Sequence, residues 1–149
     1  MSLKEKIKDD IKQAMRDKNE SRLGTLRMLS AAIQRREVDE RIQLDDTQVI
    51  VVIEKLVKQG RESIEQYVKG GRQELADKES SEIALYQAYL PQQLSEAEVD
   101  KLVVEAIAAT GANSVKDMGK VMGVLKPKLQ GRADMGQVGS KVKARLGAA

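Results

Sequence analysis

Proline is absent from the first ninety residues of this 149-residue chain, and this absence narrows the possible folds more than any other feature. The two prolines stand late, at positions 91 and 127. Ala, Leu, Lys, Glu, Gln and Arg dominate elsewhere, and these residues have high helix propensity. Because there is no Phe, Trp or Cys, the core must be built mainly from Leu, Ile, Val, Met and Ala.

Apolar residues recur every three or four positions along most of the chain, which is the spacing of helices with one buried face. The valine-rich run 49–57 has the composition of a buried strand, but its helical spacing continues to Val68, with Gly60 as an irregularity. The chain is therefore predicted to be all-α and multihelical. Helices are expected over residues 3–16, 22–41, 46–69, 72–89, 96–110, 115–126 and 135–146.

Local signals mark where these helices begin and end. Ser2, Asp45, Ser95 and Asp134 each stand three residues before a Glu or Gln, a pattern typical of helix N-termini. Pro91 and the polar segment after it predict a joint. We expect an N-terminal unit of long helices over residues 1–92 and a compact three-helix unit over residues 95–149.

Missing residue types exclude several kinds of chemistry. With neither Cys nor His, thiol catalysis and the commonest metal sites are ruled out. The adjacent acidic pairs at 9–10, 39–40 and 45–46 stand in polar or capping contexts, so we predict no catalytic residue, metal or cofactor. No signal peptide and no apolar run long enough for a bilayer is evident, so the expectation is a cytoplasmic protein without a membrane partner.

Positive charge is concentrated in the last quarter of the chain. From residue 112 to 149, eight Lys and Arg stand against two acidic residues, a net +6, whereas the remainder carries a net −3. Such asymmetry indicates an anionic partner for the C-terminal part. The three tyrosines fall outside this region at core spacing, so any RNA contact there should involve phosphates more than bases.

The segment 118–134, MGKVMGVLKPKLQGRAD, holds most of the candidate site. Gly119 and Gly123 stand one turn apart, and the favoured interpretation is close packing against another helix, with direct approach of a ligand as the alternative. Pro127 is expected to end the helix, Gly131 to take a positive φ, and Asp134 to cap the next helix.

Lysines and arginines surround that turn, and the sequence leaves two interpretations of them open. One is a capped turn with solvated cations, and the other is a phosphate site at a helix end. A Walker motif is absent, so nucleotide hydrolysis is not expected. If the site binds RNA, the expected phosphate contacts are Lys120, Lys126, Lys128, Arg132 and Lys141.

Several segments resemble a known family. MGKVMGVLKPKLQGRAD followed by VGSKVKARL resembles the tail domain of GatB, which is part of the aspartyl/glutamyl-tRNA amidotransferase. The runs RLGTLRMLSAAI (22–33), RESIEQY (61–67) and AYLPQQLSEAEV (88–99) resemble the stand-alone YqeY proteins, a likeness that covers essentially the whole chain. The elements Gly-Lys-x-Met and Gly-Arg-Ala-Asp of the family match Gly119, Lys120, Met122 and residues 131–134, while Gly123 departs from the amidotransferase tail, where a bulkier residue is expected.

The resemblance implies an all-helical, two-part protein that contacts tRNA without active-site residues of its own. GatB/YqeY domain proteins are associated with glutamine-dependent carbon–nitrogen ligase activity. Under this resemblance, that association describes the pathway to which the protein belongs, and it does not imply that the protein itself is the catalyst. The leading hypothesis is a non-catalytic module that binds structured RNA, with tRNA as the first candidate, in a translation-related complex. The alternative is a protein–protein interaction adaptor without RNA binding, which would use the polar faces at 35–41 and 72–82.

Overall fold

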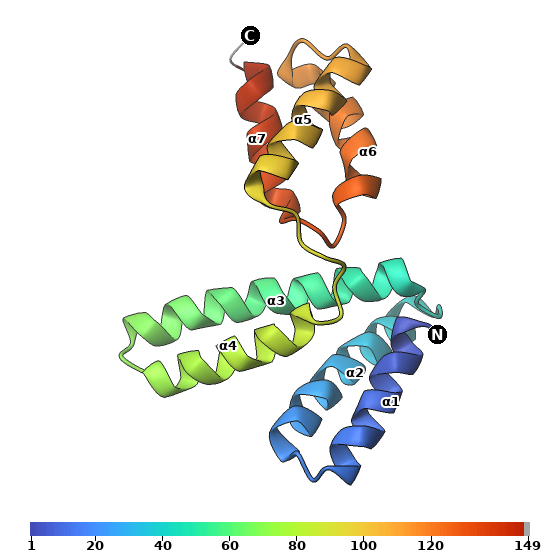
Figure 1. Cartoon of the computed structure of the whole chain (residues 1–149), viewed down its shortest axis with the longest axis vertical. Helices are drawn as coiled ribbons and strands as arrows, with labels where there is room; N and C mark the ends of the chain where they lie inside the picture. The colour runs from blue at the N-terminus through green and yellow to red at the C-terminus, as the bar shows by residue number, and fades with distance from the viewer. Residues whose placement is uncertain (148–149) are drawn as a thin grey trace. The chain divides into compact units, whose positions relative to one another are not determined.

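A computed structural model describes residues 1–147, which form seven α-helices, one short 3₁₀-helix and, within that range, no strand. The all-α prediction is confirmed. The chain divides into two compact units, Met1–Leu90 and a second that begins at Pro91 (Figure 1). The observed division thus falls two residues before the end of the predicted N-terminal unit.

Two antiparallel helix pairs make up the N-terminal unit. Helix α1 (Leu3–Arg16) packs on α2 (Glu20–Glu40), and α3 (Asp46–Lys69) packs on α4 (Gln73–Gln87). Complete capping boxes at Ser2 and Asp45 begin α1 and α3, as predicted. Helix α2 begins two residues earlier than predicted because the side chain of Asn19 accepts a hydrogen bond from the Arg22 N–H at 3.1 Å.

An aliphatic core fills the N-terminal unit. Leu26, Leu29, Val49 and Ile53 are fully buried. Removing such side chains from water is worth roughly 1.5–3 kcal/mol each, which exceeds the helix-propensity differences between residues. The period of the apolar residues therefore decided the structure of the valine-rich run, and the helix prediction for it is confirmed.

Tyr86 and Tyr89 are buried, in agreement with the core interpretation, and Tyr67 is half-buried. The Tyr89 hydroxyl donates a hydrogen bond to the Asp10 carboxylate, and the Lys6 ammonium lies 5.6 Å from the centroid of the Tyr89 ring. These contacts fasten the end of α4 to α1. Spacing in the sequence could not reveal them, because the partners are 79 positions apart.

Gly60 allows α3 and α4 to approach each other. A Cβ atom at this position would lie 2.9 Å from Cγ1 and 3.0 Å from Cδ1 of Ile83 on α4. Carbon atoms in contact prefer roughly 3.5–4.0 Å. The irregularity in the helical pattern of α3 is thus the place where the neighbouring helix fits.

The charged segment 35–41 is not simply the solvated helix face that its composition suggests. Glu37 accepts hydrogen bonds from Lys4 Nζ at 2.5 Å and from the Leu44 N–H at 2.8 Å, and the Lys4 bond in particular lowers the pKa of Glu37. Arg36 pairs with Glu40 and also donates to the Gln48 carbonyl at 3.3 Å. These side chains hold the connection between α2 and α3.

The C-terminal unit packs three helices around a second core. It contains α5 (Glu96–Thr110), the 3₁₀-helix η1 (Val115–Asp117), α6 (Met118–Leu129) and α7 (Met135–Gly147). Ser95 Oγ accepts from the Glu98 N–H at 3.2 Å and donates to the Glu98 carboxylate at 3.0 Å. The expected capping box is therefore only half formed. The fully buried core residues are Val103, Val121, Leu125, Leu129, Val138 and Val142.

Pro127 does not end α6, contrary to prediction, since the helix continues to Leu129. A helix-interior proline costs about 3 kcal/mol, but here it lies in the last turn. Leu129 is completely buried, and the Gln130 N–H still bonds to the Lys126 carbonyl at 2.9 Å. Burial of Leu129 and this terminal bond offset the loss at Pro127.

The first residues after Pro91 are bound to the turn between α6 and α7. Gln93 Nε2 donates to the Gly131 carbonyl at 2.6 Å, and the Leu94 N–H donates to the Arg132 carbonyl at 2.9 Å. The segment that was predicted to be a joint between the two units therefore belongs to the C-terminal unit.

Candidate nucleic-acid interface

The exposed face of α6 is the centre of the candidate interface. Its opposite face carries Val121, Leu125 and Leu129 into the core. At about 100° per residue, Gly119, Gly123 and Pro127 fall together on the solvent side. All three are exposed.

The glycines on this face do not serve close helix packing, so that interpretation is wrong. A Cβ atom at Gly119 or at Gly123 would have no atom within 4 Å. Interior glycines cost a helix about 1 kcal/mol each relative to alanine, and no contact within the described chain accounts for that cost. Because glycine has no side chain, the helix backbone is uncovered at these two positions, and we call this part of the α6 surface the bare strip.

Lysines surround the bare strip. The helical rotation places Lys120 and Lys126 on its two opposite flanks, and Lys128 lies further round the helix, toward the edge of the buried face. All three are exposed, and none forms an ion pair within residues 1–147. We call this surface the α6 cationic face, defined by Gly119, Lys120, Gly123, Lys126, Pro127 and Lys128. Their ammonium groups remain available to an anion.

The remaining two predicted cations have partners in the protein. Lys141 Nζ lies 2.6 Å from Asp100 Oδ1 and 3.2 Å from Glu96 Oε1, and the bond to Asp100 in particular raises the pKa of Lys141. Arg132 is half-buried, and its Nε donates to the Gln92 carbonyl at 3.2 Å. Lys141 therefore ties α7 to α5, and Arg132 holds the segment that follows Pro91.

The turn between α6 and α7 has the geometry expected of its residues. Gly131 has a φ of 78°, which favours glycine. Asp134 Oδ1 accepts from the N–H groups of Gly136 at 2.8 Å and Gln137 at 3.2 Å, and so caps α7. Met122 is half-buried against the core. The family motif residues around the turn thus fix the backbone from which Lys126 and Lys128 project.

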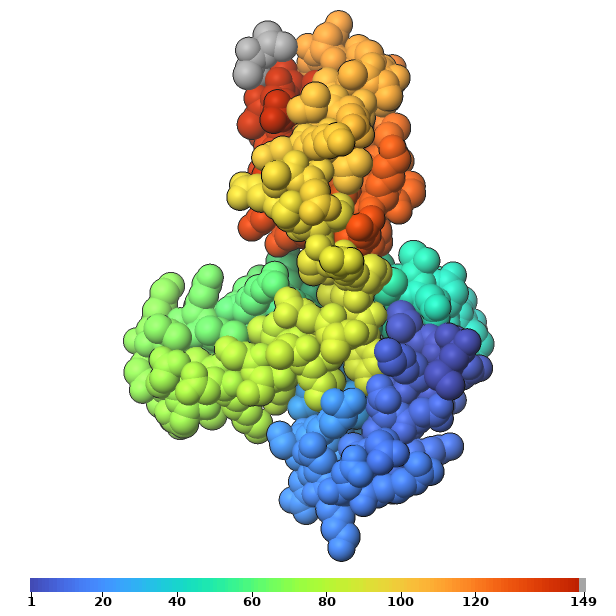
Figure 2. Space-filling model, in the orientation of Figure 1, coloured from blue at the N-terminus to red at the C-terminus, as the bar shows by residue number. Residues whose placement is uncertain are grey.

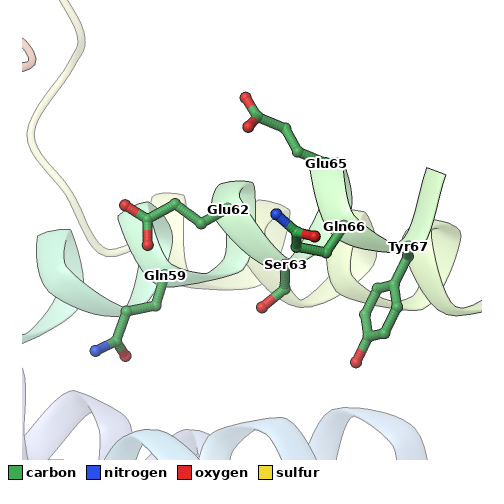
Figure 3. A pocket seen from close by; sticks show the side chains of 6 residues that line it. All are labelled: Gln59, Glu62, Ser63, Glu65, Gln66 and Tyr67. Carbon is green, nitrogen blue, oxygen red and sulfur yellow. The ribbon is translucent and has the colours of Figure 1, made fainter. Parts of the chain in front are cut away.

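One pocket of the N-terminal unit shows no catalytic arrangement among the side chains that line it. This pocket is lined by Gln59, Glu62, Ser63, Glu65, Gln66 and Tyr67, all from α3. Figure 3 shows Gln59, Ser63 and Tyr67 pointing to one side of this helix and Glu65 to the other, so these groups do not converge on a reacting atom. Within residues 1–147 no cluster of acidic side chains could hold a metal ion.

Comparison with known proteins assigns the family. The profile of the Yqey-like protein family matches residues 4–146. This chain belongs to that family. The predicted YqeY resemblance is confirmed over nearly the full length, whereas the relation of this Yqey-like chain to the amidotransferase tail stays a general family association.

Curated relatives of this Yqey-like chain share one name, "Altered inheritance of mitochondria protein 41, mitochondrial". The protein from Pyrenophora tritici-repentis is 30% identical over 146 residues, 96% of this chain and 80% of that protein. The one from Eremothecium gossypii is 41% identical over 85 residues, 56% of this chain and 46% of that protein. For Vanderwaltozyma polyspora the figures are 31% over 120 residues, 75% and 64%. The chain therefore spans between about half and four fifths of these relatives.

These names correct the predicted cytoplasmic location. The relatives are named as mitochondrial proteins. The prediction rested on the absence of a recognisable signal peptide and of a long apolar run, and an aliphatic helical Yqey-like domain has no chemical requirement for one compartment. Among the helices of the described residues, none is long and apolar enough to cross a membrane.

Proposed function

We propose that the C-terminal unit binds structured RNA, with tRNA as the first candidate, through contacts between the α6 cationic face and phosphates. The observation that carries this proposal is the set of three exposed lysines without acidic partners around a strip of bare helix backbone. Under this proposal the protein acts as a docking module in a translation-related complex and supplies no active site of its own.

Each part of the face suits a sugar–phosphate backbone. Lysines act on phosphates as point charges, and the release of counterions supplies much of the affinity. Without side chains at Gly119 and Gly123, a nucleic-acid backbone can come closer to α6 than it could to a helix covered by long residues. Because no aromatic side chain lies in this region, the contacts should position the RNA without identifying its bases.

Removal of the three lysines tests the proposal. The variant K120A/K126A/K128A should bind bulk tRNA more weakly, and the slope of log K against log salt should decrease by roughly 2–3, from 0.7–0.9 for each lost phosphate contact. Fluorescence anisotropy over a series of salt concentrations measures both quantities. Duplex DNA in parallel measures the preference for RNA.

A matched variant separates location from net charge. K55A/K58A/K69A removes the same charge from exposed lysines of α3 that also have no ion pair in the described part of the chain. We expect it to retain the wild-type salt slope. Equal losses of tRNA affinity in the two variants would show that binding depends only on the overall charge. An unchanged salt slope in K120A/K126A/K128A would refute the proposed face.

A further inference from the structure

Two exposed lysines of the C-terminal unit have no part in the α6 cationic face. Lys116 belongs to the 3₁₀-helix η1, and Lys143 belongs to α7. Neither forms an ion pair with a residue of the described chain, 1–147. Since η1 contacts both α6 and α7, these lysines belong to elements that adjoin the proposed RNA contact.

Glycines of α7 place Lys143 beside the beginning of α6. A Cβ atom at Gly139 would lie 3.6 Å from Met118 Cε, and one at Gly147 would lie 3.9 Å from Val115 Cγ2. Lys143 lies one helical turn from each of these glycines, on the same side of α7. It therefore projects from the edge of α7 that adjoins η1 and the first turn of α6.

The acidic residues of the unit are concentrated on another helix. Helix α5 has four acidic residues and one lysine, a net −3, whereas residues 115–147 have eight Lys and Arg and two acidic residues, a net +6. Figure 2 shows α5, in yellow, between α7 and α6 on the near face of the unit. Of the two acidic residues in 115–147, Asp117 accepts from the Asn113 N–H at 3.2 Å, and Asp134 caps α7. Positive charge thus continues from α6 to η1 and α7.

The available lysines come from neighbouring elements and do not form a single line. Lys120 and Lys126 project from α6, whereas Lys116 and Lys143 belong to η1 and α7. The axes of helices that pack directly, as α6 and α7 do, lie about 8–10 Å apart. A single strand of RNA presents one line of phosphates, and a double helix presents two, one on each side of a groove. Two separated groups of cations fit the double helix.

The composition of the unit also favours double-helical RNA. Proteins that bind single-stranded RNA stack its bases on aromatic side chains. All three tyrosines precede Pro91, and no Phe or Trp is present, so the C-terminal unit has no stacking platform. A-form RNA helices are recognised mainly by shape and by contacts to phosphates and 2′-hydroxyls, which lysines can make without aromatic neighbours.

We infer that the RNA surface of the C-terminal unit extends to Lys116 and Lys143 and binds a double-helical segment of the RNA. The lysines of α6 contact phosphates of one strand, and Lys116 and Lys143 contact phosphates of the other. This inference rests on the proposed RNA binding, and it names the form of RNA that the surface recognises.

A comparison of RNA forms tests the inference with the full-length chain. The probes are a labelled RNA duplex of about 16 base pairs, the length that a double-strand-binding module spans, and each of its strands alone. Fluorescence anisotropy should show the duplex bound at least tenfold more tightly than either strand. A strand bound as tightly as the duplex would overturn the inference.

A second pair of variants tests the two added lysines. For K116A/K143A the slope of log K against log salt on the RNA duplex should decrease by roughly 1.4–1.8, from 0.7–0.9 for each lost phosphate contact. The control K101A/R145A removes the same charge from exposed residues of the same unit. Arg145 follows Lys143 by two positions and therefore points to another side of α7. We expect the control to retain the wild-type slope.

The outcomes separate this inference from the proposed function. A reduced slope in K120A/K126A/K128A together with an unchanged slope in K116A/K143A would leave the α6 cationic face in place and refute its extension. Equal decreases in K116A/K143A and K101A/R145A would also refute the extension, since overall charge would explain both. A wild-type chain that binds neither the duplex nor the strands would refute RNA binding itself.

Discussion

Glycines inside the helices of this protein have opposite structural roles, and a single added methyl group distinguishes them. Gly60 lies where α4 leaves no space for a Cβ atom, whereas Gly24 and Gly123 face open space. Glycine is therefore required for helix packing at position 60, whereas at positions 24 and 123 a side chain would meet no neighbouring atom.

Substitution by alanine should separate these roles. In G60A the contact with Ile83 costs about 1–3 kcal/mol, and the gain in helix propensity returns about 1 kcal/mol, so we expect a net destabilisation of about 1 kcal/mol. G24A, in the same unit, should stabilise by up to about 1 kcal/mol. Urea unfolding followed by circular dichroism measures both, since the chain has no tryptophan. Stabilisation in both variants would contradict the close approach at Gly60.

Tyr86 predicts an alkaline limit to stability. Burial, together with Glu82 and Glu79, raises the pKa of Tyr86 from 10.0 to about 12. Below pH 10 the hydroxyl is protonated in both the folded and the unfolded state, so its contribution to stability is complete there. Between pH 10 and 12 only the unfolded state loses the proton, and stability falls, on the order of 2 kcal/mol.

The variant Y86F removes this titration and leaves the lysines in place. Its free energy of unfolding should decrease less steeply than that of the wild type across the same pH interval. Chemical denaturation at a series of alkaline pH values measures the difference. Parallel curves would show that the hydroxyl titrates alike in the folded and unfolded states.

At the scale of the helices, local chemistry predicted beginnings better than ends. The side chains of Ser2, Asp45 and Asp134 each accept a bond from the backbone they precede, because such caps depend only on neighbours in sequence. The end of α6 depends instead on Leu129, whose buried position is decided by distant residues. Hence Pro127 was wrongly expected to end the helix.

Replacement of Pro127 tests the balance in α6. P127A restores an N–H that can bond to the Gly123 carbonyl, and should stabilise the C-terminal unit by about 1 kcal/mol or more. P91A lies outside any helix and, by making the unfolded chain more flexible, should destabilise slightly. Thermal unfolding compares the two variants. A destabilised P127A would assign the proline a favourable role in the turn that follows.

For the candidate site, too, features that depend on neighbouring residues were predictable, and contacts between residues far apart in the sequence were not. Composition indicated a basic C-terminal region, and the family resemblance pointed to the segment around Gly131. Neither could show that Lys141 is engaged by Asp100 and Glu96, which lie more than 40 positions away, or that α6 turns its two glycines outward.

For the whole molecule, the decisive feature is that the two cores share no residue. L125A removes a fully buried side chain of the second core, and should destabilise that unit by about 2–5 kcal/mol. Amide hydrogen exchange in α1–α4 should stay as in the wild type, and L26A should give the reverse pattern. Accelerated exchange throughout the chain in either variant would show that the two units unfold together.

Tyr89 is fastened to Asp10, and the segment from Gln92 to Leu94 is fastened to Gly131 and Arg132. Only Leu90 and Pro91 remain between these anchors, and the proline ring allows its residue little rotation. The stretch of chain between the two sets of anchors is therefore only about two residues long, and each unit keeps its own hydrogen bonds on its own side of that stretch.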